Sequence, residues 1–122
     1  MTFRAILTLT VLLLTFAVLA PAADVSGKWT AQIDTPIGVQ NYTYEFKVDA
    51  GKLTGKAVSP NGESAIQDGK VSGDEISFVE MMKFQDQAIR VTYKGKIAGD
   101  EIKFTRSVGE FGTEDFVAKR AK

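Results

Sequence analysis

The chain has 122 residues, with 15 Lys and Arg against 15 Asp and Glu, so its formal net charge at pH 7 is zero. This balance argues against nucleic-acid binding, which uses a basic face to replace phosphate counterions. The sequence contains no His and no Cys. Disulfide bonds, the common zinc, copper and haem ligand sets and His-based catalytic triads are therefore excluded, and we expect neither a metal nor a cofactor.

The first 22 residues have the pattern of a secretory signal peptide. Arg4 gives a short positive start, residues 5–20 are almost entirely apolar, and Ala20 and Ala22 are the small residues that a signal peptidase reads. We expect cleavage near Ala22, which leaves one small domain over residues 24–122. The mature chain is then secreted or periplasmic and has no membrane anchor, because the apolar run is short for a membrane-spanning helix and lacks anchors on both sides.

Beyond Asp24 the sequence alternates between apolar and polar residues with a period of two, which is typical of half-buried strands. Short segments rich in turn-forming residues separate the strands, and every connection is short enough for a hairpin. The pattern predicts an all-β fold, an eight-stranded antiparallel up-and-down meander closed into a small barrel, because closure removes exposed strand edges. The predicted strands are 27–34, 41–49, 52–59, 64–72, 75–82, 88–98, 101–107 and 113–120.

A ten-residue repeat supports this fold, because the segment from Gly69 to Phe78 returns almost unchanged from Gly95 to Phe104. Each copy reads as a hairpin with a two-residue Gly-Asp turn. A third hairpin turns at Ala50-Gly51. In each of the three, a glycine is expected to lie opposite an aromatic ring and to permit strong strand curvature. The expected pairs are Gly55 with Phe46, Gly69 with Phe78, and Gly95 with Phe104.

The two ends of the predicted barrel differ. The three tight turns and both termini share one end, which we expect to be closed. The other end has the longer predicted connections, near 34–40, 59–63, 83–88 and 107–113. These contain more apolar residues than loops need, so this end is expected to be a ligand mouth or a protein-binding surface. The residues assigned to this loop-end surface are Ile37, Val39, Phe84 and Phe111.

The segment Ser26-Gly27-Lys28-Trp29 is similar to the Gly-x-Trp opening of the calycin barrels, the lipocalins and avidins. This resemblance implies a binding barrel whose floor is closed by Trp29. It also implies that an Arg of the last strand packs on that ring, and Arg120 is the matching candidate for such a cation–π contact. The chain is shorter than typical lipocalins and lacks their disulfide. The resemblance does not indicate which ligand is bound.

Two charged residues follow the repeat at equivalent inward positions, Glu80 in the first copy and Arg106 in the second. The hairpin register places Arg106 opposite Tyr93, with Glu80 one strand beyond. An interior charge is costly unless it is paired. The two residues could form an internal salt bridge or orient a ligand at the cavity floor, or a bulge could turn one of them outward.

Three tyrosines, Tyr42, Tyr44 and Tyr93, share the inward face in the mouth-side half, and Gln67 joins them if its strand keeps register. They are either ordinary core rings or the lining of a small-molecule cavity. An eight-stranded barrel holds side chains or one small ligand. A filled interior, with Glu80, Tyr93 and Arg106 mutually satisfied, would contradict a small-ligand site.

We therefore expect an exported barrel that binds a small, partly apolar ligand at its open end. The alternative is a protein-interaction module, inhibitor-like or part of the envelope, that uses the apolar loops. No catalytic residue is assigned, because Glu80 is the only inward carboxylate that the register supports and acid–base cleavage of a glycoside needs two.

Overall fold

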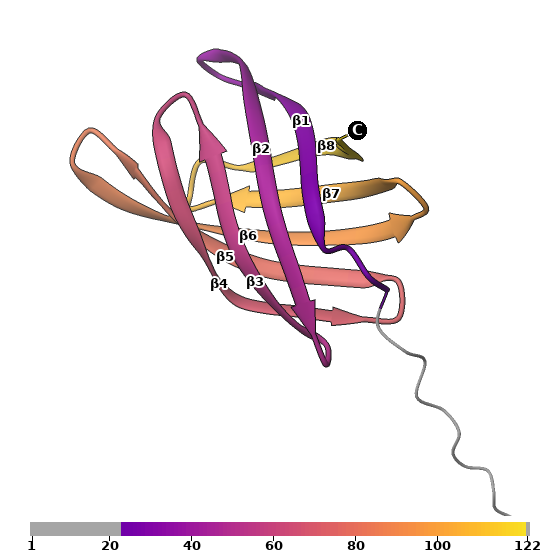
Figure 1. Ribbon diagram of the computed structural model, residues 1–122. Helices are drawn as coiled ribbons and strands as arrows, with labels where there is room; N and C mark the ends of the chain where they lie inside the picture. The colour runs from indigo at the N-terminus through magenta and orange to yellow at the C-terminus, as the bar shows by residue number, and fades with distance from the viewer. Residues whose placement is uncertain (1–22, 122) are drawn as a thin grey trace, which may run out of the picture.

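The structure, a computed structural model, describes residues 23–121, so the predicted signal peptide lies outside the described residues. Within residues 23–121 no helix is long and apolar enough to cross a membrane. The fold is all-β (Figure 1). Its strands are β1 (Gly27–Thr35), β2 (Gly38–Asp49), β3 (Lys52–Ser59), β4 (Gly62–Ser72), β5 (Glu75–Phe84), β6 (Gln87–Ala98), β7 (Glu101–Val108) and β8 (Thr113–Arg120).

The sheet is an antiparallel meander that closes on itself, as the sequence predicts. Each strand pairs with the next one along the chain, and β8 returns to pair with β1. The closing register is short: Trp29 lies opposite Arg120, Thr30 opposite Lys119, and Ala31 opposite Ala118. Closure therefore rests on three residue pairs near the two ends of the domain.

The predicted glycine–ring pairs are present in two of the three hairpins. Gly55 lies opposite Phe46, and Gly95 lies opposite Phe104. A Cβ atom added at Gly95 would lie 2.7 Å from the Phe104 ring, closer than side chains pack. At Gly55 the backbone φ is +143°, which also favours glycine. At both positions the absent side chain lets the strand curve tightly around a core ring.

The third predicted pair, Gly69 with Phe78, is present only as part of a bulge. A β-bulge at Asp68, which has a φ of +52°, places Asp68 and Gly69 together against Phe78. On the other side of β4, Gly69 lies opposite Leu53 of β3. The extra residue reverses which side chains of β4 face inward, because a one-residue shift exchanges the two faces of a strand.

The open end has tighter turns than the sequence suggests. The β1–β2, β3–β4 and β5–β6 connections have two residues each, because these strands continue further than predicted. Between β5 and β6 both turn residues, Gln85 and Asp86, adopt positive φ, a conformation that the sequence gives little reason to expect without glycine. The four-residue β7–β8 connection, Gly109–Gly112, is the longest in the described barrel.

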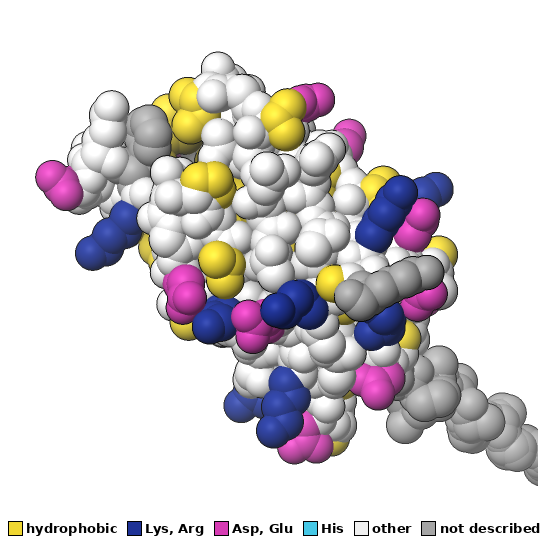
Figure 2. Space-filling view, turned by 45° about the horizontal axis from the view of Figure 1, so that its top comes forward, with side chains coloured by type: hydrophobic (Ala, Val, Ile, Leu, Met, Phe, Trp, Pro, Cys, Tyr) yellow, Lys and Arg dark blue, Asp and Glu magenta, His cyan; other side chains and the backbone are white. Residues whose placement is uncertain are grey.

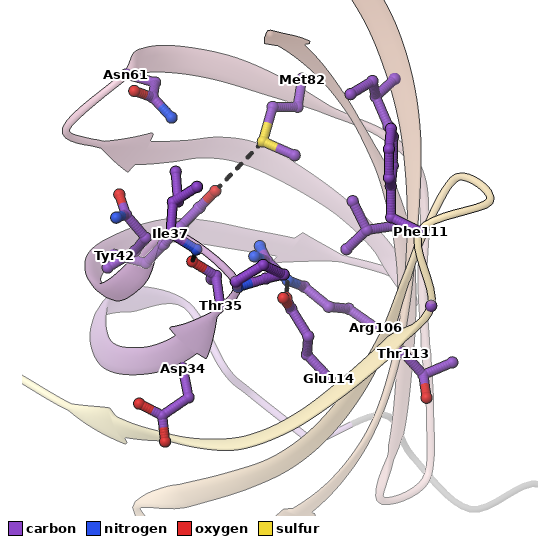
Figure 3. A pocket seen from close by; sticks show the side chains of 15 residues that line it. Asp34, Thr35, Ile37, Tyr42, Asn61, Met82, Arg106, Phe111, Thr113 and Glu114 are labelled. Carbon is purple, nitrogen blue, oxygen red and sulfur yellow. Dashed lines mark hydrogen bonds and ion pairs between the residues drawn. The ribbon is translucent and has the colours of Figure 1, made fainter.

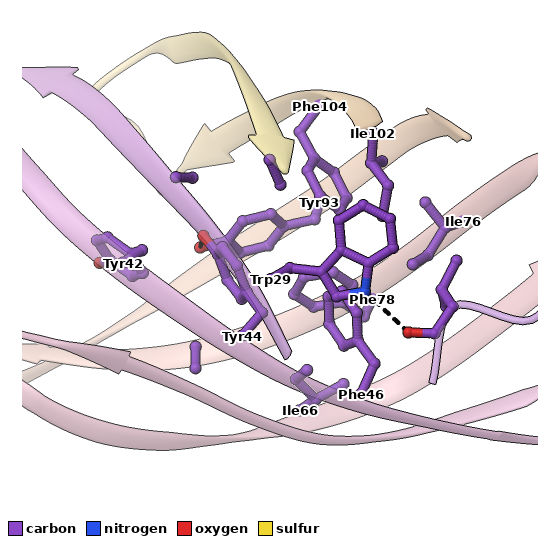
Figure 4. Packing of buried hydrophobic residues seen from close by; sticks show 14 of the residues in the cluster. Trp29, Tyr42, Tyr44, Phe46, Ile66, Ile76, Phe78, Tyr93, Ile102 and Phe104 are labelled. Carbon is purple, nitrogen blue, oxygen red and sulfur yellow. Dashed lines mark hydrogen bonds between the residues drawn. The ribbon is translucent and has the colours of Figure 1, made fainter. Parts of the chain in front are cut away.

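The interior toward the closed end is filled with aromatic side chains (Figure 4). Neighbouring rings contact one another in stacked or edge-on arrangements; Phe78 and Tyr93, for example, stack with centroids 4.2 Å apart. Trp29 is fully buried and donates a 2.9 Å hydrogen bond from Nε1 to the Val25 carbonyl oxygen. The ring cluster comprises Trp29, Tyr44, Phe46, Phe78, Tyr93, Phe104 and Phe116.

Candidate functional site

A cavity of about 500 Å³ opens among the loops at the other end of the barrel (Figure 3). Its wall is mainly apolar, with one buried cation and a few polar groups. The lining residues that matter below are Asp34, Ile37, Tyr42, Met82, Ile89, Arg106, Val108, Phe111 and Glu114. The barrel is therefore hollow at its open end and filled at its closed end.

Arg106 reaches this cavity because β7 alternates, with Ile102, Phe104 and Arg106 all on its buried face. The predicted register is confirmed, since Arg106 lies opposite Tyr93 of β6. Its Nη1 donates a 2.9 Å hydrogen bond to the Tyr93 hydroxyl. Its Nε donates a 2.6 Å hydrogen bond to Oε1 of Glu114, which lies opposite on β8. The guanidinium is thus fixed from two neighbouring strands.

A chain of hydrogen bonds connects Arg106 to Glu80. The Tyr93 hydroxyl donates to Glu80 Oε1 at 2.7 Å and accepts from Tyr44 at 3.0 Å. Glu80 and Arg106 are each only 2% exposed, so both point inward as predicted and neither is turned out by a bulge. A direct salt bridge between them, one of the alternatives that the sequence left open, is absent, because Tyr93 lies between the two charges and Arg106 pairs with Glu114.

Burial and contacts set the protonation of this network. Burial raises the pKa of Tyr44 and of Tyr93 well above their ordinary value, so both hydroxyls keep their protons. Burial alone would lower the pKa of Arg106, but Tyr93, Tyr42 and Glu114 outweigh it and hold that pKa above its ordinary value. The guanidinium therefore remains a cation, with its Cζ atom 4.9 Å from the centroid of the Tyr42 ring.

Glu114 is the site residue that sequence reasoning missed. The view that Glu80 is the only inward carboxylate is wrong, because Glu114 shares the inner face of β8 with Phe116 and Ala118. The period-two alternation of that strand was the signal that could have found it. Glu114 is less buried than Arg106, with 15% of its side chain exposed against 3%, and it lies at the rim where the strand leaves the β7–β8 loop.

Gln67, a predicted cavity residue, is exposed on the outside of β4. The bulge at Asp68 is the physical reason. It shifts by one residue the side chains that face inward in the part of β4 before Asp68. Ile66 takes the inward position instead and is 8% exposed. The prediction for Gln67 depended on an unbroken register, and that register is not kept.

The remaining candidates divide between the cavity and the layer beneath it. Tyr42 and Arg106 line the cavity, whereas Tyr44, Glu80 and Tyr93 lie beneath and are not part of its wall. The cavity is therefore shallower than the small-molecule cavity that the sequence predicts. Its floor is supported by a polar layer whose members already satisfy one another.

Of the loop-end residues, Ile37 and Phe111 line the cavity and are 62% and 73% exposed. Val39 is 58% exposed but lies outside the cavity wall. The side chain of Phe84 is not among the described ones; its backbone ends β5 opposite Gln87. Figure 2 turns the upper part of Figure 1 toward the viewer and shows hydrophobic side chains among the loops, with most charged side chains lower on the surface.

At the closed end Arg120 packs over Trp29, with its Cζ atom 4.5 Å from the ring, so the expected cation–π contact is present. Arg120 also donates from Nη1 to the Ser26 carbonyl oxygen at 3.0 Å and from Nε to Asp100 Oδ1 at 3.1 Å. The first bond joins the last strand to the segment before β1, and the second joins it to the β6–β7 turn. The pair has a structural role in closing the barrel floor.

Comparisons of the chain with protein families, with characterised proteins and with solved structures find no match. The site itself defines a class of protein: an eight-stranded barrel with a filled floor and a mainly apolar cavity at its mouth. Among residues 23–121 no three acidic side chains gather as a metal site would require. The resemblance to calycins stays a prediction.

Proposed function

We propose that this protein is an exported barrel that binds a small, partly apolar molecule through its open end. The observation that carries the proposal is the cavity of about 500 Å³. Small-molecule sites are typically cavities of roughly 300–1,000 Å³ with apolar walls and a few polar groups that fix orientation. The wall of this cavity fits that description, with Ile89, Val108 and Phe111 as apolar contacts and Arg106 as a buried polar contact.

The filled lower half changes where the ligand is proposed to bind. The Tyr93 hydroxyl joins Glu80 and Arg106 by hydrogen bonds, which argues against a deep site between them. The cavity begins above that layer, at the level of Tyr42 and Arg106. We therefore place the ligand between the Arg106 floor and the loops, where the barrel is hollow.

Export and a calycin-like character belong to the same proposal. The apolar run ahead of Ala22 supports export, since it has the pattern of a cleavable signal. The packing of Arg120 on Trp29 at the closed end supports a calycin-like arrangement. These two features come from different parts of the chain and are compatible with one ligand-binding barrel.

Native mass spectrometry of protein purified from its own host tests the proposal. We expect a bound mass that is absent when Val108→Trp fills the cavity wall. Val117→Trp is the matched control, because Val117 lies on the adjacent strand, faces outward and is 38% exposed. An empty wild-type barrel, or a bound mass that Val108→Trp retains, would contradict the proposal.

The second candidate is a protein-interaction module that uses the loop end. It is favoured by the exposure of Ile37, Val39 and Phe111 on one end of the barrel. Val39 separates the two functions, because it is exposed but does not line the cavity. Val39→Asp should abolish co-elution with a protein partner from cell extract while leaving a small ligand bound. The double variant Ile37→Asp, Phe111→Asp should affect both.

A further inference from the structure

We propose that the ligand carries an uncharged oxygen acceptor, such as a carbonyl or hydroxyl group on an apolar body, and that Arg106 and Tyr42 bind this oxygen. The inference rests on the proposed ligand-binding function and specifies the chemistry of that site. It follows from the donors that the cavity floor offers and from the charges around them.

The first donor is a nitrogen of Arg106. Nε donates to Glu114 and Nη1 donates to Tyr93. Apart from the Tyr42 hydroxyl, which also hydrogen-bonds the guanidinium, Nη2 has no acceptor among the residues that the structure describes. Arg106 is 2% exposed and forms part of the cavity wall. A buried donor without an acceptor is costly, so a ligand oxygen that satisfies Nη2 gains binding free energy.

The second donor is the hydroxyl of Tyr42, which is 3% exposed and lines the same cavity. It donates only to the thioether sulfur of Met82, at 3.7 Å (Figure 3). Sulfur is a weak acceptor, so a ligand oxygen can replace it with a net gain. Two floor donors without a strong acceptor of their own select a ligand with an acceptor oxygen.

The charge balance decides between a neutral oxygen and a carboxylate. Glu114 already neutralises Arg106 across a 2.6 Å contact. The lining holds Asp34 as a second carboxylate and contains no lysine. An anionic ligand would therefore add a negative charge next to Glu114, which is only 15% exposed, and the two like charges would repel. Asp34 is exposed and contributes less, because water and salt screen its charge. A neutral acceptor has no such cost.

Displacement of the neutral fluorescent dye N-phenyl-1-naphthylamine measures these preferences. The competitors have matched ten-carbon chains: decan-2-one, decanoate, decylammonium and decane. In the wild type we expect decan-2-one to bind about tenfold more tightly than decanoate or decane, the scale of one hydrogen bond to a charged group. Dye binding itself reports whether the cavity accepts an apolar body.

Two variants test the role of charge. Glu114→Gln leaves Arg106 without its counter-charge, so decanoate should gain about tenfold and approach or overtake the ketone. Glu110→Gln is the matched control, because Glu110 is exposed in the loop that precedes β8 and lies outside the cavity wall. The double variant Arg106→Met, Glu114→Met removes the ion pair together, which avoids leaving one buried charge alone. It should bind decan-2-one no better than decane.

The outcomes separate the two proposals. Dye binding with the ketone preferred, and with the expected shift in Glu114→Gln, supports the inference. If the wild type binds dye but prefers decanoate or decylammonium, the neutral-acceptor inference is wrong while the proposed function stands. If decane and decan-2-one compete equally, the neutral-acceptor inference is also wrong and the proposed function stands. A folded wild-type protein that binds neither dye nor any competitor overturns both.

Discussion

The two ends of this barrel differ in how their interior is filled, although the same strands form both. At the closed end, rings on β1, β2 and β5 to β8 fill the interior and Arg120 covers Trp29. At the open end the same inward faces leave a cavity of about 500 Å³ above Arg106. The layer between them, Tyr44, Tyr93 and Glu80, is polar and buried.

The comparison shows how a small domain without disulfides holds a cavity open. The filled half supplies the hydrophobic stabilisation, which at this size comes from one core. The polar layer then fixes the side chains that form the cavity floor. Stability should therefore be concentrated below this layer and binding above it, and substitutions at the two ends should have separable effects.

The largest expected effect is at the closed end. Trp29→Ala should lower the free energy of unfolding by about 3–5 kcal/mol, because it removes a fully buried ring and leaves a cavity. Urea unfolding followed by circular dichroism measures this change. Phe111→Ala, which truncates a ring that is 73% exposed at the open end, should change it by less than about 0.5 kcal/mol. Equal losses of unfolding free energy in the two variants would contradict the view that stability is concentrated at the closed end.

The polar layer is tested by removing one hydroxyl at a time. Tyr93→Phe should cost about 3 kcal/mol of unfolding free energy, because both Glu80 and Arg106 lose a hydrogen bond. Tyr44→Phe removes a single donor to Tyr93 and should cost about 1 kcal/mol. Equilibrium unfolding of the two variants compares them, and a larger cost for Tyr44→Phe would contradict the central position of Tyr93.

Alkaline pH should loosen the same layer. The pKa values of Tyr44 and Tyr93 are raised in the folded barrel, whereas tyrosine in an unfolded chain ionises near pH 10. Above that pH the unfolded chain releases protons that the folded chain retains, so stability falls as the pH rises. The slope should approach about 1.4 kcal/mol per pH unit for each tyrosine.

Unfolding free energies measured between pH 9 and 11.5, together with tyrosinate absorbance, check this prediction. Tyr44→Phe should reduce the slope of unfolding free energy against pH by the contribution of one tyrosine, about 1.4 kcal/mol per pH unit. Tyrosinate absorbance from Tyr44 and Tyr93 should appear only as the protein unfolds. A stability that is independent of pH above 10 would show that these hydroxyls are accessible to solvent in the folded state.

The smallest effect compares ion pairs at the two ends. Glu114→Gln at the open end should cost about 1 kcal/mol, because its partner Arg106 has a side chain that is only 3% exposed. Asp100→Asn at the closed end should cost less than about 0.5 kcal/mol, because Asp100 is 76% exposed and water screens its contact with Arg120. Thermal unfolding of both variants at low and high salt gives the comparison.

Much of the fold was predictable because the turns and the alternation are local signals. Gly95 opposite Phe104 follows from counting outward from the Gly99-Asp100 turn. The bulge at Asp68 was not predictable, since an Asp at positive φ leaves no clear pattern in one sequence. It moved Gln67 to the outside and placed Asp68 beside Gly69 opposite Phe78.

The site was predictable in part, for the same reason. Register placed Arg106 opposite Tyr93, but it could not show that Tyr93 would stand between Arg106 and Glu80. That depends on how long side chains share space in three dimensions. Glu114 could have been found by alternation alone, because it lies two residues before Phe116 on the same face.

The seam between β1 and β8 has a consequence for the order of folding. Every other strand pair joins sequence neighbours, whereas this seam joins Trp29 to Arg120, 91 positions apart in the chain. Long-range closure is entropically costly and slow. The seven hairpins can therefore form locally while the barrel is still an open, curved sheet, and the pairing between β1 and β8 forms last. Glu114 pairs with Arg106 within the local β7–β8 hairpin, whereas Tyr42 of β2 lies beside Arg106 only once the barrel has closed. The cavity and the closed barrel are therefore completed together.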